Sequence, residues 1–108
     1  MARGAALAAA LLCGRQAAAD EPPTFDVSIR DGRFEPTRLV VPAGTRIRLV
    51  LRNEGSGPSE FESAALHVEK VLAAGSRSML VIQKLQPGTH RFRDEFHPDA
   101  GEFVLVAK

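Results

Sequence analysis

The chain has 108 residues, of which 44% are hydrophobic and 25% are charged, and its formal net charge is +1. This balance is typical of a folded domain, because disordered chains are poorer in apolar residues and carry more net charge. One cysteine excludes an internal disulfide and any metal site built from several thiolates. No uninterrupted apolar run reaches the roughly 18 residues that a transmembrane helix needs.

The N-terminal segment has the features of a signal peptide in their usual order. Arg3 supplies a positive start, residues 4–12 form an apolar run of mostly Ala and Leu, and residues 17–19 offer three small alanines for cleavage. We therefore expect residues 1–19 to be a signal peptide and residues 20–108 to form the domain. The alternative is that the Ala-rich segment is a helix of the fold itself.

Removing the leader changes the composition of the domain. Arg3, Arg15 and Cys13 leave with it, so the 14 basic side chains become 12 against 13 acidic ones, and no cysteine remains. The exported domain would have a charge of −1. A near-neutral domain gives no electrostatic reason to expect nucleic-acid binding.

Alternation of apolar and polar residues predicts a series of short strands. Phe25, Val27 and Ile29 share one face of the first segment, and turn signals rich in Gly and Pro separate the later ones. Strand-like segments occur at residues 24–30, 34–36, 39–41, 45–53, 60–63, 66–72, 77–85, 89–94 and 103–107. They favour an all-β sandwich or barrel of about seven strands. A helix over residues 62–74 is the alternative for that stretch, because its apolar positions fit neither period.

Four polar residues in the middle of the chain could share a metal. In strands, Glu60 and Glu62 would lie on one face, and His67 and Glu69 would lie on one face. Each pair, considered alone, is also typical of solvated side chains on a protein surface that bind no metal. Oxygen and imidazole ligands without sulfur suit Fe, Cu(II), Mn or Zn.

A second group of candidates lies near the C-terminus. Alternation places Phe92 and Asp94 on the inward face of their strand, and an inward carboxylate is costly unless it is paired or binds a cation. His97 follows three residues later, so the loop could deliver two ligands to one point. Only the fold can show whether Glu60 lies near Asp94.

Two segments resemble cupredoxins. Residues 34–44 begin Phe-Glu-Pro, end Pro-Ala-Gly and precede an alternating strand that ends at Asn53, which is similar to the opening of that family. Residues 85–92 read Leu-Gln-Pro-Gly-Thr-His-Arg-Phe and resemble the family's approach to its metal-binding loop. The resemblance implies a cupredoxin-like Greek-key β-sandwich. His90 stands where the family often has Tyr, and we interpret it as structural.

Three acidic and histidine-containing segments resemble a narrower group, the small exported cupredoxin-like proteins associated with bacterial permease-type iron uptake. These segments are residues 60–63, 66–70 and 94–99. The resemblance places Glu60 and His97 at positions where blue-copper cupredoxins have ligand histidines, and Asp94 where they have the ligand cysteine. A blue site requires a copper–thiolate bond, so blue-copper electron transfer is excluded.

The resemblance implies a metal site that holds an iron or copper ion. Its residues would be Glu60, Asp94 and His97, with Glu62, His67 and Glu69 as additional ligands. The leading hypothesis is a periplasmic, non-blue metal-binding protein acting in iron or copper acquisition or delivery. Its partner would be an iron permease or another periplasmic uptake component.

Two other classes of function remain open. One is a metal-free docking module for an exported or membrane protein, in which the outward Arg46, Arg48 and Arg52 would face the partner. The other is a small enzyme using the same site, such as a copper-dependent Fe(II) oxidase or a hydrolase. Catalysis would require an open coordination position and access for substrate, which a sequence does not reveal.

Overall fold

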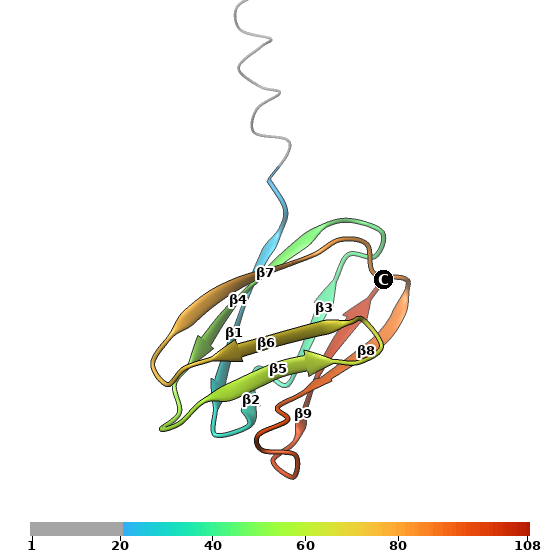
Figure 1. Cartoon of the computed structure of the whole chain (residues 1–108). Coiled ribbons are helices and arrows are strands. Elements are labelled where there is room, and N and C mark those ends of the chain that lie inside the picture. Colours follow the sequence, from blue (N-terminus) through green and yellow to red (C-terminus); the bar gives the residue numbers. More distant parts are fainter. Residues whose placement is uncertain (1–20) are drawn as a thin grey trace, which may run out of the picture.

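The computed structural model describes residues 21–108, which form two β-sheets packed face to face (Figure 1). The predicted signal peptide over residues 1–19 lies outside the described residues. Within residues 21–108 no helix has the length and hydropathy of a membrane span, and the alternative helix over residues 62–74 is wrong. The strands are β1 (Thr24–Arg30), β2 (Arg33–Glu35), β3 (Arg38–Val41), β4 (Ile47–Asn53), β5 (Ser59–Ser63), β6 (Val68–Leu72), β7 (Arg77–Ile82), β8 (Gly88–Arg93) and β9 (Glu102–Ala107).

The strand order confirms the all-β Greek-key sandwich expected from the sequence. One sheet has the order β2-β1-β4-β7 and the other has the order β3-β9-β8-β5-β6. β1 and β4 pair in parallel, as do β3 and β9, while the other neighbours are antiparallel. Most connections therefore pass from one sheet to the other, as in β-sandwich folds.

The described residues form nine strands rather than about seven, because the two short segments β2 and β3 pair with different sheets. Three predicted strands are also shorter than expected, since the segment 45–53 starts at Ile47, the segment 77–85 ends at Ile82, and the segment 66–72 starts late. The segment 66–72 becomes a strand only at Val68, since the chain turns at His67, which has a positive φ of 57°. The N–H of His67 donates to the carbonyl of Ala64 at 3.2 Å and closes this turn.

Alternate residues of both sheets fill the core. Four phenylalanine rings meet within it: Phe34, Phe61, Phe92 and Phe103. The rings of Phe61 and Phe92 are stacked with their centroids 4.5 Å apart. Successive side chains of a strand point to opposite faces, so the inward Phe61 directs Glu60 and Glu62 to the outer face of the five-stranded sheet.

The buried side chain of Asn53 fixes the loop that leads into β5. Its Nδ2 donates to the carbonyl of Gly57 at 2.9 Å and to that of Leu72 at 3.0 Å. Its Oδ1 accepts a hydrogen bond from the N–H of Gly55 at 2.9 Å. These contacts join the end of β4 to the end of β6 and set the position at which Glu60 enters its strand.

Candidate metal centre

Three glutamates gather on the outer face of the β5–β6 hairpin. Glu62 and Glu69 are direct cross-strand partners, and Glu60 lies two residues before Glu62 on the same face. Each of the three offers a carboxylate oxygen, and these oxygens all lie within 4.8 Å of one another. Among residues 21–108 this is the group of three or more acidic, His or Cys side chains with that spacing.

The carboxylates repel one another, and their surroundings favour protonation. Glu60 is only 7% exposed, and burial, followed by the charge of Glu69 and a hydrogen bond shared with it, raises its pKa. A hydrogen bond shared with Glu95, followed by burial and neighbouring carboxylates, raises the pKa of Glu62. Such a cluster holds a proton or a metal cation more favourably than it holds several bare negative charges.

Glu95 is a site residue that the sequence did not single out. It lies in the loop after β8, and its Oε1 accepts hydrogen bonds from Nη2 of Arg93 at 2.8 Å and from Nε at 3.1 Å. These contacts, followed by the hydrogen bond from Glu62, lower the pKa of Glu95. Arg93 is also the partner of Glu62 across β5 and β8, so one guanidinium lies at the rim of the acidic cluster.

Asp94 is fully buried at the end of β8, as its alternation with Phe92 predicted. Its Oδ1 accepts hydrogen bonds from the backbone N–H groups of Glu60 and Phe96, each at 2.9 Å. Burial acts to raise the pKa of Asp94, but the hydrogen bonds from Glu60, His97 and Phe96 outweigh it and lower the pKa. The cost of an inward carboxylate is thus offset by hydrogen bonds within the protein.

The hydroxyl of Ser59 lies close to the same carboxylate and helps to lower its pKa. The geometry falls outside that of a full hydrogen bond, however, so the Ser59 Oγ has no hydrogen-bond partner among the described residues. The backbone amides and the His97 ring therefore provide the main stabilisation of the Asp94 carboxylate.

His97 is held beside Asp94 by its ring and by its backbone. Its Nδ1 lies 2.9 Å from Oδ2 of Asp94, and its N–H donates to the Asp94 carbonyl at 3.0 Å. The side chain is 33% exposed, and it packs against the buried Gly32, where a Cβ would lie 2.3 Å from the Cβ of His97. Nε2 is the ring nitrogen that Asp94 does not engage.

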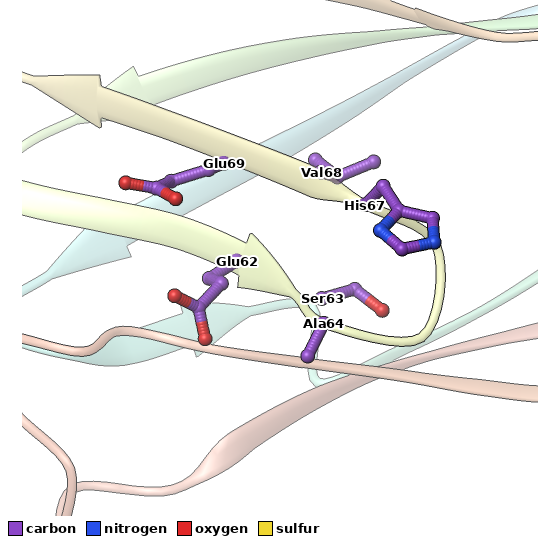
Figure 2. A pocket seen from close by; sticks show the side chains of 6 residues that line it. All are labelled: Glu62, Ser63, Ala64, His67, Val68 and Glu69. Atoms are coloured by element: carbon purple, nitrogen blue, oxygen red, sulfur yellow. The ribbon is translucent and has the colours of Figure 1, made fainter.

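His67 lies apart from the carboxylate oxygens. It lines a shallow pocket of about 370 Å³ together with Glu62, Ser63 and Glu69 (Figure 2). In Figure 2 the carboxylates of Glu62 and Glu69 lie at one end of this pocket, and the imidazole lies at the turn at the other end. The sequence predicted that His67 and Glu69 lie on one face of a strand. This prediction is wrong, because the chain turns at His67 before the strand begins.

The six predicted ligands thus fall into three places. Glu60, Glu62 and Glu69 form the carboxylate cluster, Asp94 and His97 form a hydrogen-bonded pair, and His67 lies at the hairpin turn. The backbone N–H of Glu60 donates to Asp94 at 2.9 Å, and this hydrogen bond joins the first two places.

A family model described as cupredoxin-like domain matches residues 3–106. The chain belongs to this family. A curated relative, an uncharacterised protein of Rickettsia prowazekii (strain Madrid E), is 33% identical over 81 residues, which cover 74% of this chain and 65% of the relative. The chain therefore spans less than two thirds of the length of that relative.

Several solved structures share the fold. Reduced auracyanin from Roseiflexus castenholzii has a TM-score of 0.66 at 13% identity, covering 79% of this chain and 96% of auracyanin. A purple cupredoxin from Nitrosopumilus maritimus has a TM-score of 0.59 at 18% identity, covering 77% and 98% of the two chains. The metal-binding domain of a Cu(I)-exporting P-type ATPase from Streptococcus pneumoniae has a TM-score of 0.66 at 8% identity, covering 79% and 84%.

A blue-copper centre does not fit this cupredoxin-like chain. Residues 21–108 contain no cysteine, and both oxygens of Asp94 are already engaged by Glu60, Phe96 and His97. Without a thiolate, the residues cannot form the bond on which a blue site depends. The carboxylate cluster provides oxygen ligands, which suit a harder cation.

Proposed function

We propose that this cupredoxin-like protein is an exported metal-binding protein that acquires or delivers iron or copper in the periplasm. The observation that carries the proposal is the cluster formed by Glu60, Glu62 and Glu69, whose carboxylate oxygens lie within 4.8 Å of one another. Structures with the same fold include copper proteins by their descriptions, such as a purple cupredoxin and a Cu(I) exporter domain. Metal binding by this chain is therefore a property to test directly.

The oxygen donors of the cluster favour Fe(III) over Fe(II). Three carboxylates present hard oxygen donors, and a bound cation would offset both their burial and their mutual repulsion. The cluster lies on an outer sheet face with Glu69 exposed, so an ion can enter and leave without opening the core. This accessibility suits delivery better than permanent storage.

The role in uptake follows from the resemblance of the acidic segments to iron-permease-associated proteins and from the predicted signal peptide. An exported carrier would bind the ion outside the cytoplasmic membrane and present it to a permease or another uptake component. Because metal binding requires deprotonated carboxylates, affinity would fall as the pH falls, and binding would release protons.

Metal titration of matched variants tests the proposal. Purified protein is titrated with Fe(II) under anaerobic conditions, with Fe(III) supplied as a weak chelate, and with Cu(II), and heat and proton release are recorded. We expect the double variant Glu62→Gln/Glu69→Gln to weaken iron binding by at least about tenfold. The control Glu21→Gln/Glu35→Gln removes the same charge at exposed positions away from the cluster and should bind as the wild type does. Equal affinity in all three proteins would contradict the proposal.

A further inference from the structure

An apolar patch lies on the outer face of the other sheet, over β4 and β7. Met79 and Val81 are 58% and 43% exposed, although both occupy the middle of a strand. Their cross-strand partners are Val50 and Arg48 respectively, and Val50 is only 5% exposed. The three apolar side chains therefore form a continuous surface whose centre is already largely desolvated.

Arginines lie at both ends of this patch along β4 and β7, and Asp26 of β1 lies beside Val50. Arg48 lies opposite Val81, and Arg52 lies directly opposite Arg77 across the same pair of strands. Like charges placed opposite each other in a sheet are destabilising by themselves. Arg52 has one exposed ion pair, with Asp26 at 3.7 Å, which is too weak in water to offset much of this repulsion.

The basic residues of this sheet are arginines. Strands β1, β2, β4 and β7 contain arginine as their basic residue and no lysine. Protein interfaces are enriched in Arg and Met and depleted in Lys, with an apolar centre and a polar rim. The guanidinium group also binds carboxylates through two parallel hydrogen bonds, which an ammonium group does not do.

We propose that the Met79–Val81 patch, with Arg48, Arg52 and Arg77 at its ends, docks an acidic protein surface that carries an apolar side chain at its centre. Carboxylates of the partner would relieve the repulsion between Arg52 and Arg77. The patch lies on the sheet that contains β4 and β7, and the glutamate cluster lies on the other sheet, over β5 and β6. Figure 1 shows these sheets as two separate layers, so a partner docked on the outer face of one leaves the cluster open.

Two other occupants fit less well. An anionic membrane would be repelled by Asp26 and Glu35, which lie on the same sheet face, whereas a protein can place its charges to avoid them. A second copy of the chain could offer its own acidic cluster, but that contact would cover Glu60, Glu62 and Glu69 and would be head-to-tail, which builds a ring or an open filament rather than a two-fold dimer.

A binding assay with a defined probe distinguishes these occupants. The probe is a fluorescent synthetic peptide of alternating Glu and Leu, with a second peptide in which Gln replaces Glu, and vesicles containing an anionic lipid are titrated in parallel. We expect the acidic peptide to bind, the Gln peptide to bind at least about tenfold more weakly, and added salt to weaken the interaction. Sedimentation of the protein alone reports self-association.

The variant Arg48→Ala/Arg77→Ala/Met79→Ser should lose at least about tenfold in affinity for the acidic peptide. The control Arg38→Ala/Lys108→Ala removes two positive charges from the other sheet and the C-terminus and should bind normally. If the triple variant fails to fold, the single exposed change Arg77→Glu provides the test. The proposal would be overturned if the protein bound vesicles in preference to the peptide, or if it bound neither probe. It would also be overturned if the protein self-associated in a way that the patch variant abolishes, or if the patch and control variants bound the peptide equally.

Discussion

Asp94 and His97 form a hydrogen-bonded pair in which Oδ2 of the carboxylate lies 2.9 Å from Nδ1 of the imidazole. The other oxygen of Asp94 accepts a hydrogen bond from the backbone N–H of Glu60 at 2.9 Å. One buried carboxylate therefore ties the loop after β8 to the start of β5. Asp94 thus joins two segments, while the three nearby carboxylates of Glu60, Glu62 and Glu69 remain available to a cation.

The first prediction concerns the buried carboxylate. Asp94→Asn should lower the free energy of unfolding by about 1–3 kcal/mol, because the neutral amide weakens two backbone hydrogen bonds and one to His97. Urea unfolding at neutral pH measures the change. Asp99→Asn is the control, since this residue is exposed in the same loop, and it should leave stability within experimental error. Equal stability of the two variants would show that Asp94 does not anchor the loop.

The second prediction concerns pH. The folded-state pKa of Glu60 and Glu62 is raised, so these two groups bind more protons in the folded protein than in the unfolded chain, and their contribution to stability falls as pH rises from the unfolded pKa of about 4.5 through the folded pKa. The lowered pKa of Glu95 acts in the opposite direction. Asp94 also acts in this opposite direction, at lower pH, because its lowered pKa adds stability that is lost as pH falls through the folded pKa.

Thermal melting at a series of pH values, with and without a chelator, measures both effects. In metal-free protein, Glu60→Gln should melt at a higher temperature than the wild type above the folded pKa of Glu60 and should show a smaller decline there. Added iron should reduce the decline in the wild type, because a cation replaces the protons. A wild-type profile that coincides with that of Glu60→Gln at every pH would contradict the electrostatic interpretation of the cluster.

The third prediction concerns the close contact between Gly32 and His97. Gly32 has a φ of +85°, and an added Cβ would lie 2.3 Å from the Cβ of His97 and 2.7 Å from that of Ala100. Gly32→Ala should therefore destabilise the fold by roughly 2–4 kcal/mol and displace the His97 ring. Gly44→Ala is the matched control, because its φ is +72° but nothing lies within 4 Å of the added Cβ. NMR of the imidazole should show a change in the first variant and none in the control.

The fourth prediction concerns copper. Protein carrying Cys13→Ser should give no intense blue colour with Cu(II), since residues 21–108 contain no thiol to form a copper–thiolate bond. Optical and electron paramagnetic resonance spectra should instead report oxygen ligands, as the carboxylates of Glu60, Glu62 and Glu69 would provide. An intense thiolate-to-copper band from this variant would contradict the assignment.

The strand pattern and the inward position of Asp94 could be predicted, because both depend on alternation within one strand. Phe92 and Asp94 lie two residues apart, so they share a face regardless of which strands pair with theirs. The contact between Glu62 and Glu69 depends on the register of two strands, and the contact between Glu62 and Glu95 depends on a loop from a third. Neither register nor loop path is encoded in local spacing.

His67 shows where local reasoning was misleading. Its predicted alignment with Glu69 required a strand from residue 66 onward, but the chain adopts a left-handed turn at His67 and the strand starts at Val68. The sequence offers a weak sign of this turn, since Ser63, Ala64 and Ala65 contribute few large side chains for a strand.

The most direct test of the central claim is an anomalous difference map from crystals soaked with Fe(III) supplied as a weak chelate and measured at the iron absorption edge. The account predicts one strong peak between the carboxylates of Glu60, Glu62 and Glu69, which should disappear in crystals of Glu62→Gln/Glu69→Gln. A peak centred on His97 and Asp94 without the three glutamates, or no peak in the wild type, would contradict it.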